Sequence, residues 1–245
     1  MHIHPTMKMS ELVQADFELL AVLQRLKIPF GFKDKSIKTV CREEGIDLNF
    51  FLNLARWFHE RDFFPGETLM HHPVKWLVKY LRNTHACYLE YHIPRIETEI
   101  IQLENKDHSE IHNMQLMLKF FREYITEFTT HIELEENKIF PYTLQLEENL
   151  TTNDPDPDFL EMARGYTIAD FLEEHSDLEE KLIDLRNILL KYLAPPSDNC
   201  IFTNVLVEIF RLGNDLNDHT ILEENVLIPQ VMELEKEFHK KFPPE

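Results

Sequence analysis

Apolar residues recur at three- and four-residue spacing along most of this chain, which is the spacing of a buried helix face. Glycine and proline rarely interrupt four long stretches that keep this spacing. The pattern predicts four helices of about 30 residues each, at residues 74–105, 109–140, 158–193 and 200–240. Because such helices bury their apolar stripes against one another when short turns join them, we expect an all-α fold, an antiparallel four-helix bundle.

Shorter stretches with the same spacing precede this bundle. They predict three helices, at residues 9–26, 35–44 and 48–61. Gly45 is expected to end the second of these helices, and Asp47 to cap the third. We therefore expect two domains, a small helical N-terminal domain at residues 1–65 and the bundle at residues 66–245.

Two prolines are expected to shape the predicted bundle helices. Pro94 lies inside the first long helix, where the missing amide hydrogen predicts a kink. Pro141 lies near the end of the second long helix and is expected to close it. Residues 153–158, with alternating aspartate and proline, are expected to form a linker.

Charge and composition narrow the function classes. The chain has 44 acidic and 25 basic residues, a formal net charge of −19. This balance excludes nucleic acid and anionic membrane surfaces as expected partners, because both attract clustered lysine and arginine. Three distant cysteines predict neither a disulfide framework nor a cysteine zinc site. No apolar run reaches the roughly 18 residues of a membrane helix, and no signal core leads the chain, so we expect a cytoplasmic protein.

An internal repeat carries the candidate chemistry among the 13 histidines. Residues 131–141 (His-Ile-Glu-Leu-Glu-Glu-Asn-Lys-Ile-Phe-Pro) and residues 219–229 (His-Thr-Ile-Leu-Glu-Glu-Asn-Val-Leu-Ile-Pro) share a histidine, a leucine, two glutamates, an asparagine and a proline. In each copy the histidine stands four residues before the first shared glutamate, which gives the pairs His131/Glu135 and His219/Glu223. On a helix this spacing places both side chains on one face, where imidazole and carboxylate are two ligands for a transition metal.

The other two long helices each offer one histidine, His85 and His175, at a matching height. With turns near residues 107 and 197, each of the four histidines lies 22 to 24 residues from its turn. At a rise of 1.5 Å per residue, all four lie about 33 Å from the same end of the bundle. We therefore expect four histidines and two carboxylates in one core layer, with approximate two-fold symmetry.

The alternative interpretation of such a pair is a solvated pair on a helix surface, which is the usual case for one pair alone. The shared offsets and equal heights favour a metal site, since unrelated surface pairs have no reason to agree in leucine, asparagine and proline. Nitrogen and oxygen ligands without a thiolate suit iron, manganese or zinc, and the ligand set alone does not choose among these metals.

With two His-x-x-x-Glu-x-x-x-x-x-Pro motifs and a single histidine on each of the other helices, the chain resembles the hemerythrin-like proteins, which are four-helix bundles with a non-haem di-iron site. Over residues 74–235 it is most similar to the RIC (repair of iron centres) group. The resemblance implies two iron ions joined by carboxylates and by an oxo or hydroxo bridge. It also implies the ligands of these ions. The terminal ligands would be His85, His131, His175 and His219, and the carboxylates that bridge the two irons would be Glu135 and Glu223.

Further residues match this group or depart from it. Glu127 and Glu174 match acids near the iron pair, and the alternative for both is a solvated acid. His92, which follows His85 by seven residues, is the alternative to His85 as a ligand.

The N-terminal domain departs from the RIC pattern. RIC proteins carry adjacent cysteines at the positions where this chain has Asn49 and Phe50. Only Cys41 stands nearby, upstream of these positions. A step of the family's mechanism that depends on these cysteines is therefore not expected to carry over to this chain.

The resemblance implies a protein of the oxidative and nitrosative stress response whose di-iron site supports repair of damaged iron–sulfur centres. Its partners would be small diatomic or peroxide ligands at the iron pair, and apo iron–sulfur proteins. Two alternatives stay open: a reversible carrier or sensor of O2 or NO, and a bundle with a vestigial site in which residues 1–64 mediate an interaction. The sequence also leaves open whether the site turns over a substrate.

Overall fold

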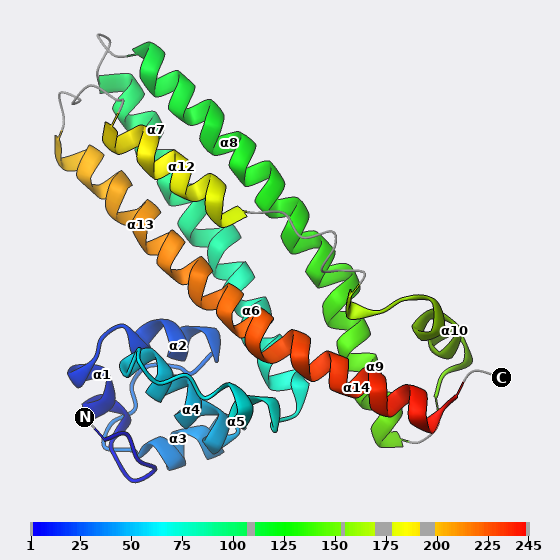
Figure 1. The fold of residues 1–245 in the computed structure, drawn as a ribbon. Coiled ribbons are helices and arrows are strands. Elements are labelled where there is room, and N and C mark those ends of the chain that lie inside the picture. Colours follow the sequence, from blue (N-terminus) through cyan, green and yellow to red (C-terminus); the bar gives the residue numbers. More distant parts are fainter. Residues whose placement is uncertain (1, 107–110, 153–154, 170–177, 192–198, 244–245) are drawn as a thin grey trace. The chain divides into compact units, whose positions relative to one another are not determined.

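The protein is all-helical throughout the part that its structure, a computed structural model, describes (Figure 1). The described residues are 2–106, 111–152, 155–169, 178–191 and 199–243. Within them the β-type pairing is limited to one isolated bridge between Lys8 and Ser36. None of the helices in these ranges has both the length and the apolar composition needed to cross a membrane. The prediction of an all-α fold is confirmed.

The chain divides into two compact units whose boundaries fall inside helices. One unit comprises Met1–Thr84, Thr143–Asp156 and Leu222–Glu245, and the other comprises His85–Tyr142 and Pro157–Ile221. The first unit thus contains the predicted N-terminal domain together with later helical segments. A separate domain at residues 1–65 stays a prediction.

The first unit begins with short helices whose ends follow local signals. They are α1 (Met9–Ala15), α2 (Leu19–Arg25), α3 (Ile37–Glu43), α4 (Leu48–His59) and α5 (Gly66–Met70). Gly45, with φ of 64°, ends α3 in the left-handed region that glycine adopts without strain. The Asp47 carboxylate accepts a hydrogen bond of 2.8 Å from the Phe50 backbone N–H and caps α4. The expected helix stop and cap are both confirmed.

The predicted helix at residues 9–26 is instead two helices, α1 and α2. The break falls at Asp16, whose carboxylate accepts a hydrogen bond of 3.1 Å from the Glu18 backbone N–H. A short acidic side chain that bonds to the backbone two residues on favours a turn over a continuing helix.

These N-terminal helices pack on the first turns of α6 (Val74–Cys87), the helix that carries His85. The Phe50 ring lies 6.4 Å from the Trp76 ring, and Arg25 Nη1 donates a hydrogen bond of 3.1 Å to the Tyr80 hydroxyl. Because Tyr80 and Phe50 are both fully buried, this contact stabilises α6 within the first unit.

In the second unit, four helices run side by side around one apolar core (Figure 1). They are α7 (Ile93–Lys106), α8 (Ile111–Leu134), α12 (Leu178–Lys191) and α13 (Asn199–Leu222). Residues at helical spacing from all four helices meet in this core, among them Ile96, Ile100, Met117, Phe121, Phe128, Leu182, Leu185, Leu189, Val205, Ile209 and Leu212. The apolar pattern of the sequence therefore identified these buried faces correctly.

The predicted helix at residues 158–193 is wrong as one continuous element. It begins as α10 (Pro157–Gly165), and Tyr166 and Thr167 are not helical. Glycine has a low helix propensity, which favours an end to the helix at Gly165. The carbonyl of Tyr166, which follows the helix end, accepts a hydrogen bond of 3.3 Å from the Tyr142 hydroxyl. A tertiary contact thus replaces the helical hydrogen bond of this carbonyl.

Three π-helical turns interrupt the long helices, and a proline follows each of them. The turns are η1 (Tyr88–His92), η2 (Glu135–Ile139) and η3 (Glu223–Leu227), and the prolines are Pro94, Pro141 and Pro229. A proline inside a regular α-helix lacks an N–H and its ring meets the carbonyl four residues earlier. A wider π turn just before the proline relieves that clash and lets the helix continue.

The expectation that Pro141 closes its helix is therefore wrong. After η2 the chain continues as α9 (Phe140–Thr152), and after η3 it continues as α14 (Ile228–Lys241). π turns occur preferentially at functional sites, and η2 and η3 each begin at the first shared glutamate of the repeat, Glu135 or Glu223.

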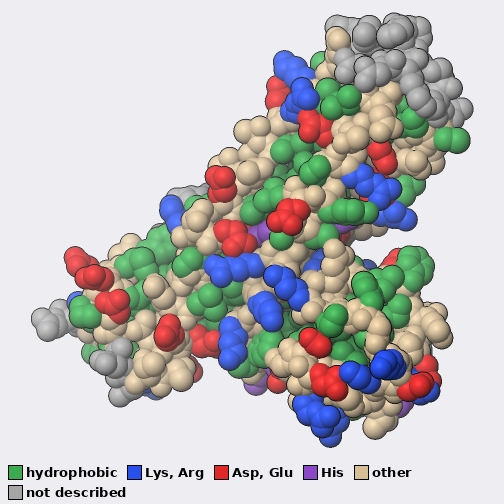
Figure 2. Space-filling model, turned by 180° about the vertical axis from the view of Figure 1, so that it is seen from behind, with side chains coloured by type: hydrophobic (Ala, Val, Ile, Leu, Met, Phe, Trp, Pro, Cys, Tyr) green, Lys and Arg blue, Asp and Glu red, His purple; other side chains and the backbone are tan. Residues whose placement is uncertain are grey.

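Charge is mixed on the molecular face drawn in Figure 2, despite the net charge of −19. Lys and Arg side chains lie between acidic and apolar side chains over this face (Figure 2). One such pair of opposite charges joins two helices, since Arg122 Nε on α8 donates a hydrogen bond of 2.7 Å to Glu97 Oε1 on α7.

Candidate metal centre

Four buried side chains present ligand atoms to one another. They are His85 on α6, Glu135 at the start of η2, His219 on α13 and Glu223 at the start of η3. Their ligand atoms all lie within 4.8 Å of one another, and the four residues are between 1% and 5% exposed. The helix that carries His219 continues directly into Glu223, one turn further on. This buried group of two imidazoles and two carboxylates can hold a metal ion.

The closest contacts in the group converge on one nitrogen of His85. His85 Nε2 lies 3.0 Å from Glu135 Oε2 and 3.1 Å from His219 Nε2. Two imidazole nitrogens that face each other share at most one proton, so at least one of them presents a lone pair to the centre. Such a lone pair beside a buried carboxylate fits a bound cation.

His131 joins the group through Glu135. His131 Nε2 lies 3.0 Å from Glu135 Oε1, whereas the other oxygen of Glu135 faces His85 at the same distance. The two oxygens of one buried carboxylate are thus directed at nitrogens from two different helices. This is the arrangement that a carboxylate needs in order to bridge two metal ions.

The electrostatics of Glu135 favour its ligand form. Burial raises the pKa of this carboxyl, but hydrogen bonds and charge from His131 and His85 outweigh the burial and hold its pKa well below its usual range. These contacts favour the ionised form of the Glu135 carboxyl. A buried ionised carboxylate is costly unless partners or a metal compensate for its lost hydration.

Glu136 is a site residue that the sequence analysis missed. Its Oε1 lies 2.9 Å from His85 Nδ1, whereas the other ring nitrogen of His85, Nε2, faces the ligand group. The His85 ring also stacks on Phe140, with 5.5 Å between ring centroids and 13° between planes. A signal was present, because Glu136 is the second glutamate that both copies of the repeat share.

Two predicted site residues, His175 and Glu174, lie outside the described residues, and their roles stay predictions. Glu127 is half-exposed and forms an ion pair with Lys181 on α12, as expected for a solvated acid.

His92, the alternative to His85, points elsewhere. His92 Nδ1 lies 3.9 Å from the buried Glu208 Oε2 on α13, and His92 is not part of the four-residue ligand group. His85 is a member of that group.

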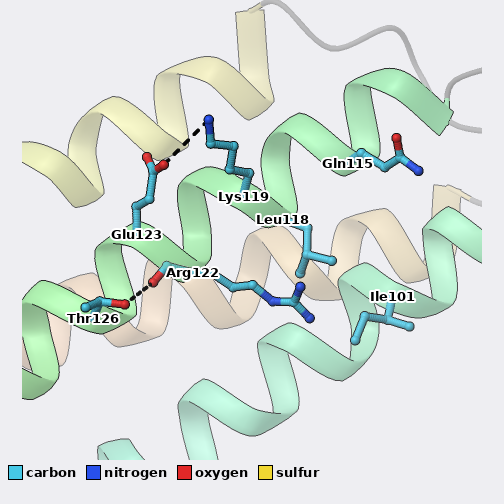
Figure 3. A pocket seen from close by; sticks show the side chains of 7 residues that line it. All are labelled: Ile101, Gln115, Leu118, Lys119, Arg122, Glu123 and Thr126. Atoms are coloured by element: carbon cyan, nitrogen blue, oxygen red, sulfur yellow. Dashed lines mark hydrogen bonds and ion pairs between the residues drawn. The ribbon is translucent and has the colours of Figure 1, made fainter.

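Two surface grooves follow α8, and they differ in their relation to the site. One groove of about 630 Å³ lies between α7 and α8 (Figure 3). Ile101 and Leu118 form its apolar part, Lys119 and Glu123 are among its lining residues, and Arg122 extends toward α7 (Figure 3). None of the candidate ligands lines this groove.

The second groove, of about 620 Å³, follows α8 into η2 and includes His131 among its lining residues. Glu127, Thr130, Asn137 and Lys138 contribute polar side chains to its lining. His131 is thus the candidate ligand that borders a described surface groove.

The N-terminal helices hold no reactive thiol at the positions of the RIC cysteine pair. Phe50 is fully buried in the core there. Burial raises the pKa of the Cys41 thiol to about 12, so Cys41 is a protonated, unreactive thiol at neutral pH.

Comparison of the chain with known protein families and with curated proteins gives no match. The chemistry of the site is therefore inferred from the buried ligand group and from the two motifs that supply it.

Proposed function

We propose that this protein is a hemerythrin-like di-iron protein, an antiparallel four-helix bundle that acts in the response to oxidative and nitrosative stress and supports repair of damaged iron–sulfur centres. The observation that carries this proposal is the placement of Glu135, whose two oxygens each lie 3.0 Å from a different histidine nitrogen. A carboxylate in this position suits a pair of metal ions about 3.5–4 Å apart.

The proposed ligand set is that expected from the repeat: His85, His131, His175 and His219 as terminal ligands, and Glu135 and Glu223 as bridges. When bound, a di-iron pair supplies redox chemistry with small oxidants such as O2, peroxide or NO. The chain's own contribution is to hold imidazole lone pairs and ionised carboxylates at fixed positions. Buried aromatic rings restrict water around them, with Tyr88 packed 5.9 Å from the His219 ring and 5.6 Å from Phe128.

The position of His92 favours repair chemistry over oxygen carriage. By resemblance, the oxygen-carrying hemerythrins have a fifth histidine that saturates one iron. The candidate for a fifth histidine here, His92, directs Nδ1 toward Glu208 rather than toward the ligand group. Four histidines and two carboxylates leave positions on the irons open to exogenous ligands, which favours redox or iron-transfer chemistry.

The test begins with metal analysis and an absorption spectrum of protein purified without oxygen. We expect about two irons per chain, from the two-metal arrangement of the ligands. Zinc or manganese in place of iron, or no metal, would contradict the proposal.

A second step separates repair from carriage. The iron-loaded protein is mixed with an apo iron–sulfur acceptor, with a strong iron chelator as the comparison, and iron transfer to each is followed. We expect transfer to the apo-acceptor. A long-lived oxygenated species after exposure of the reduced protein to O2, with no iron transfer, would favour a reversible carrier instead.

A further inference from the structure

The geometry points to Glu136 as a positioning residue that determines which nitrogen of His85 is available to a metal. This inference rests on the proposed metal site. Glu136 Oε1 lies 2.9 Å from His85 Nδ1. A carboxylate that faces Nδ1 at this distance favours the tautomer in which Nδ1 carries the proton. When a metal replaces the proton on the other nitrogen, Nε2 of this tautomer presents its lone pair to that metal.

The nitrogen selected in this way is the one that faces the ligand group. His85 Nε2 lies 3.0 Å from Glu135 Oε2 and 3.1 Å from His219 Nε2. A histidine that binds metal through one nitrogen and donates from the other to a carboxylate has a fixed ring orientation and a more basic ligand atom. Glu136 would therefore strengthen metal binding without contacting the metal.

One short segment contacts His85 on three sides. Glu135 and Glu136 are adjacent in η2, yet they reach opposite nitrogens of the same imidazole. Phe140, the first residue after η2, stacks on the face of the ring. The ring is thus restrained at both nitrogens and on one face by η2 and the start of α9.

The second copy of the repeat replaces the stacking residue. At the position of Phe140 it has Ile228, which has no ring to stack, and at the position of Glu136 it has the exposed Glu224. His175, the histidine that would correspond to His85 in this half, lies outside the described residues.

The test compares three variants of the full chain: Glu136→Ala, Glu136→Gln and, as the matched control, Glu133→Gln. Glu133 is exposed on the same helix, three residues before Glu136, so its variant makes the same change of charge. Affinity for Zn(II), a diamagnetic probe, is measured by competition with a chelator. We expect Glu136→Ala to bind about 10- to 100-fold more weakly, Glu136→Gln to lose less because its amide oxygen still accepts, and the control to stay within about twofold.

A second measurement reports on His85 itself. In the zinc-loaded protein, nitrogen NMR of the imidazoles should show a protonated Nδ1 on His85 in the wild type and in Glu136→Gln. In Glu136→Ala that Nδ1 proton should exchange faster with water. Glu136 is part-exposed, so helicity measured by circular dichroism should be unchanged; where the alanine variant loses helicity, the glutamine variant against its control decides the matter.

The outcomes separate this inference from the proposed function. If the wild type binds no metal, the proposed site is wrong. If the wild type binds metal and Glu136→Ala binds equally tightly with the same His85 signals, the site stands and the positioning role of Glu136 is wrong.

Discussion

The two copies of the repeat, residues 131–141 and 219–229, share their backbone course and differ in the surroundings of their shared residues. In both copies a histidine lies in the last turn of an α-helix, the first shared glutamate opens a π turn, and the helix passes the proline and continues. In the first copy the histidine borders a surface groove, whereas in the second it is buried.

This difference shows which features of the site come from the shared residues and which come from the residues around them. The shared residues determine the spacing of the ligands and the π turn, because both are local properties of the helix. The residues that differ, together with contacts from other helices, determine how each ligand is oriented and how much water reaches it. The two-fold symmetry of the motif therefore need not extend to the chemistry of its two halves.

The largest effect is expected from the bridging glutamates. Glu135→Ala and Glu223→Ala should each lose most of the bound iron, because each removes the carboxylate that both metals would share. The melting temperature of the metal-loaded protein should fall as well, since metal binding is linked to folding. Iron per chain and thermal unfolding are the measurements.

Glu133→Ala, on the exposed face, is the control for these variants and should keep its iron. Wild-type iron content in both bridge variants would show that neither glutamate bridges. Loss in one variant alone would show that only one copy of the repeat supplies a bridge.

A smaller difference is expected between the two repeat histidines. His219→Ala should weaken metal binding more than His131→Ala, by about tenfold, because His219 is buried against His85 whereas water from the groove can replace the His131 ligand. Chelator competition on both variants under the same conditions gives the ratio. Equal losses would indicate that burial does not distinguish the two positions.

The smallest effect is expected from Glu224→Gln. Because Glu224 is exposed, its variant should bind metal within about twofold of the wild type, in contrast to Glu136→Ala. The same affinity measurement is sufficient. A loss as large as that of Glu136→Gln would mean that both copies orient a histidine through their second glutamate, and the asymmetry described above would disappear.

Much of the fold and of the site follows from local rules that the sequence displays. Helical spacing identified the buried faces of α7, α8, α12 and α13, and the residues at Gly45 and Asp47 predicted a helix end and a cap. The four-residue offset in the repeat predicted that Glu135 and His131 would meet, which they do at 3.0 Å.

Other features depended on neighbours that are distant in the sequence. Pro141 was expected to end a helix, because proline disfavours a regular α-helix, yet a π turn lets the chain continue. The helix expected to run past Gly165 breaks where the Tyr142 hydroxyl donates a hydrogen bond to the backbone carbonyl of Tyr166.

The sequence by itself determined the all-helical fold, the ligand types and their spacing along each helix, because helix periodicity relates residues three and four apart. Only the tertiary structure decided that the two oxygens of Glu135 face histidines from two different helices, and that Glu136 faces His85 from 51 positions away. Which side chains meet across helices depends on helix rotation, and a single π turn changes that rotation for every residue that follows it.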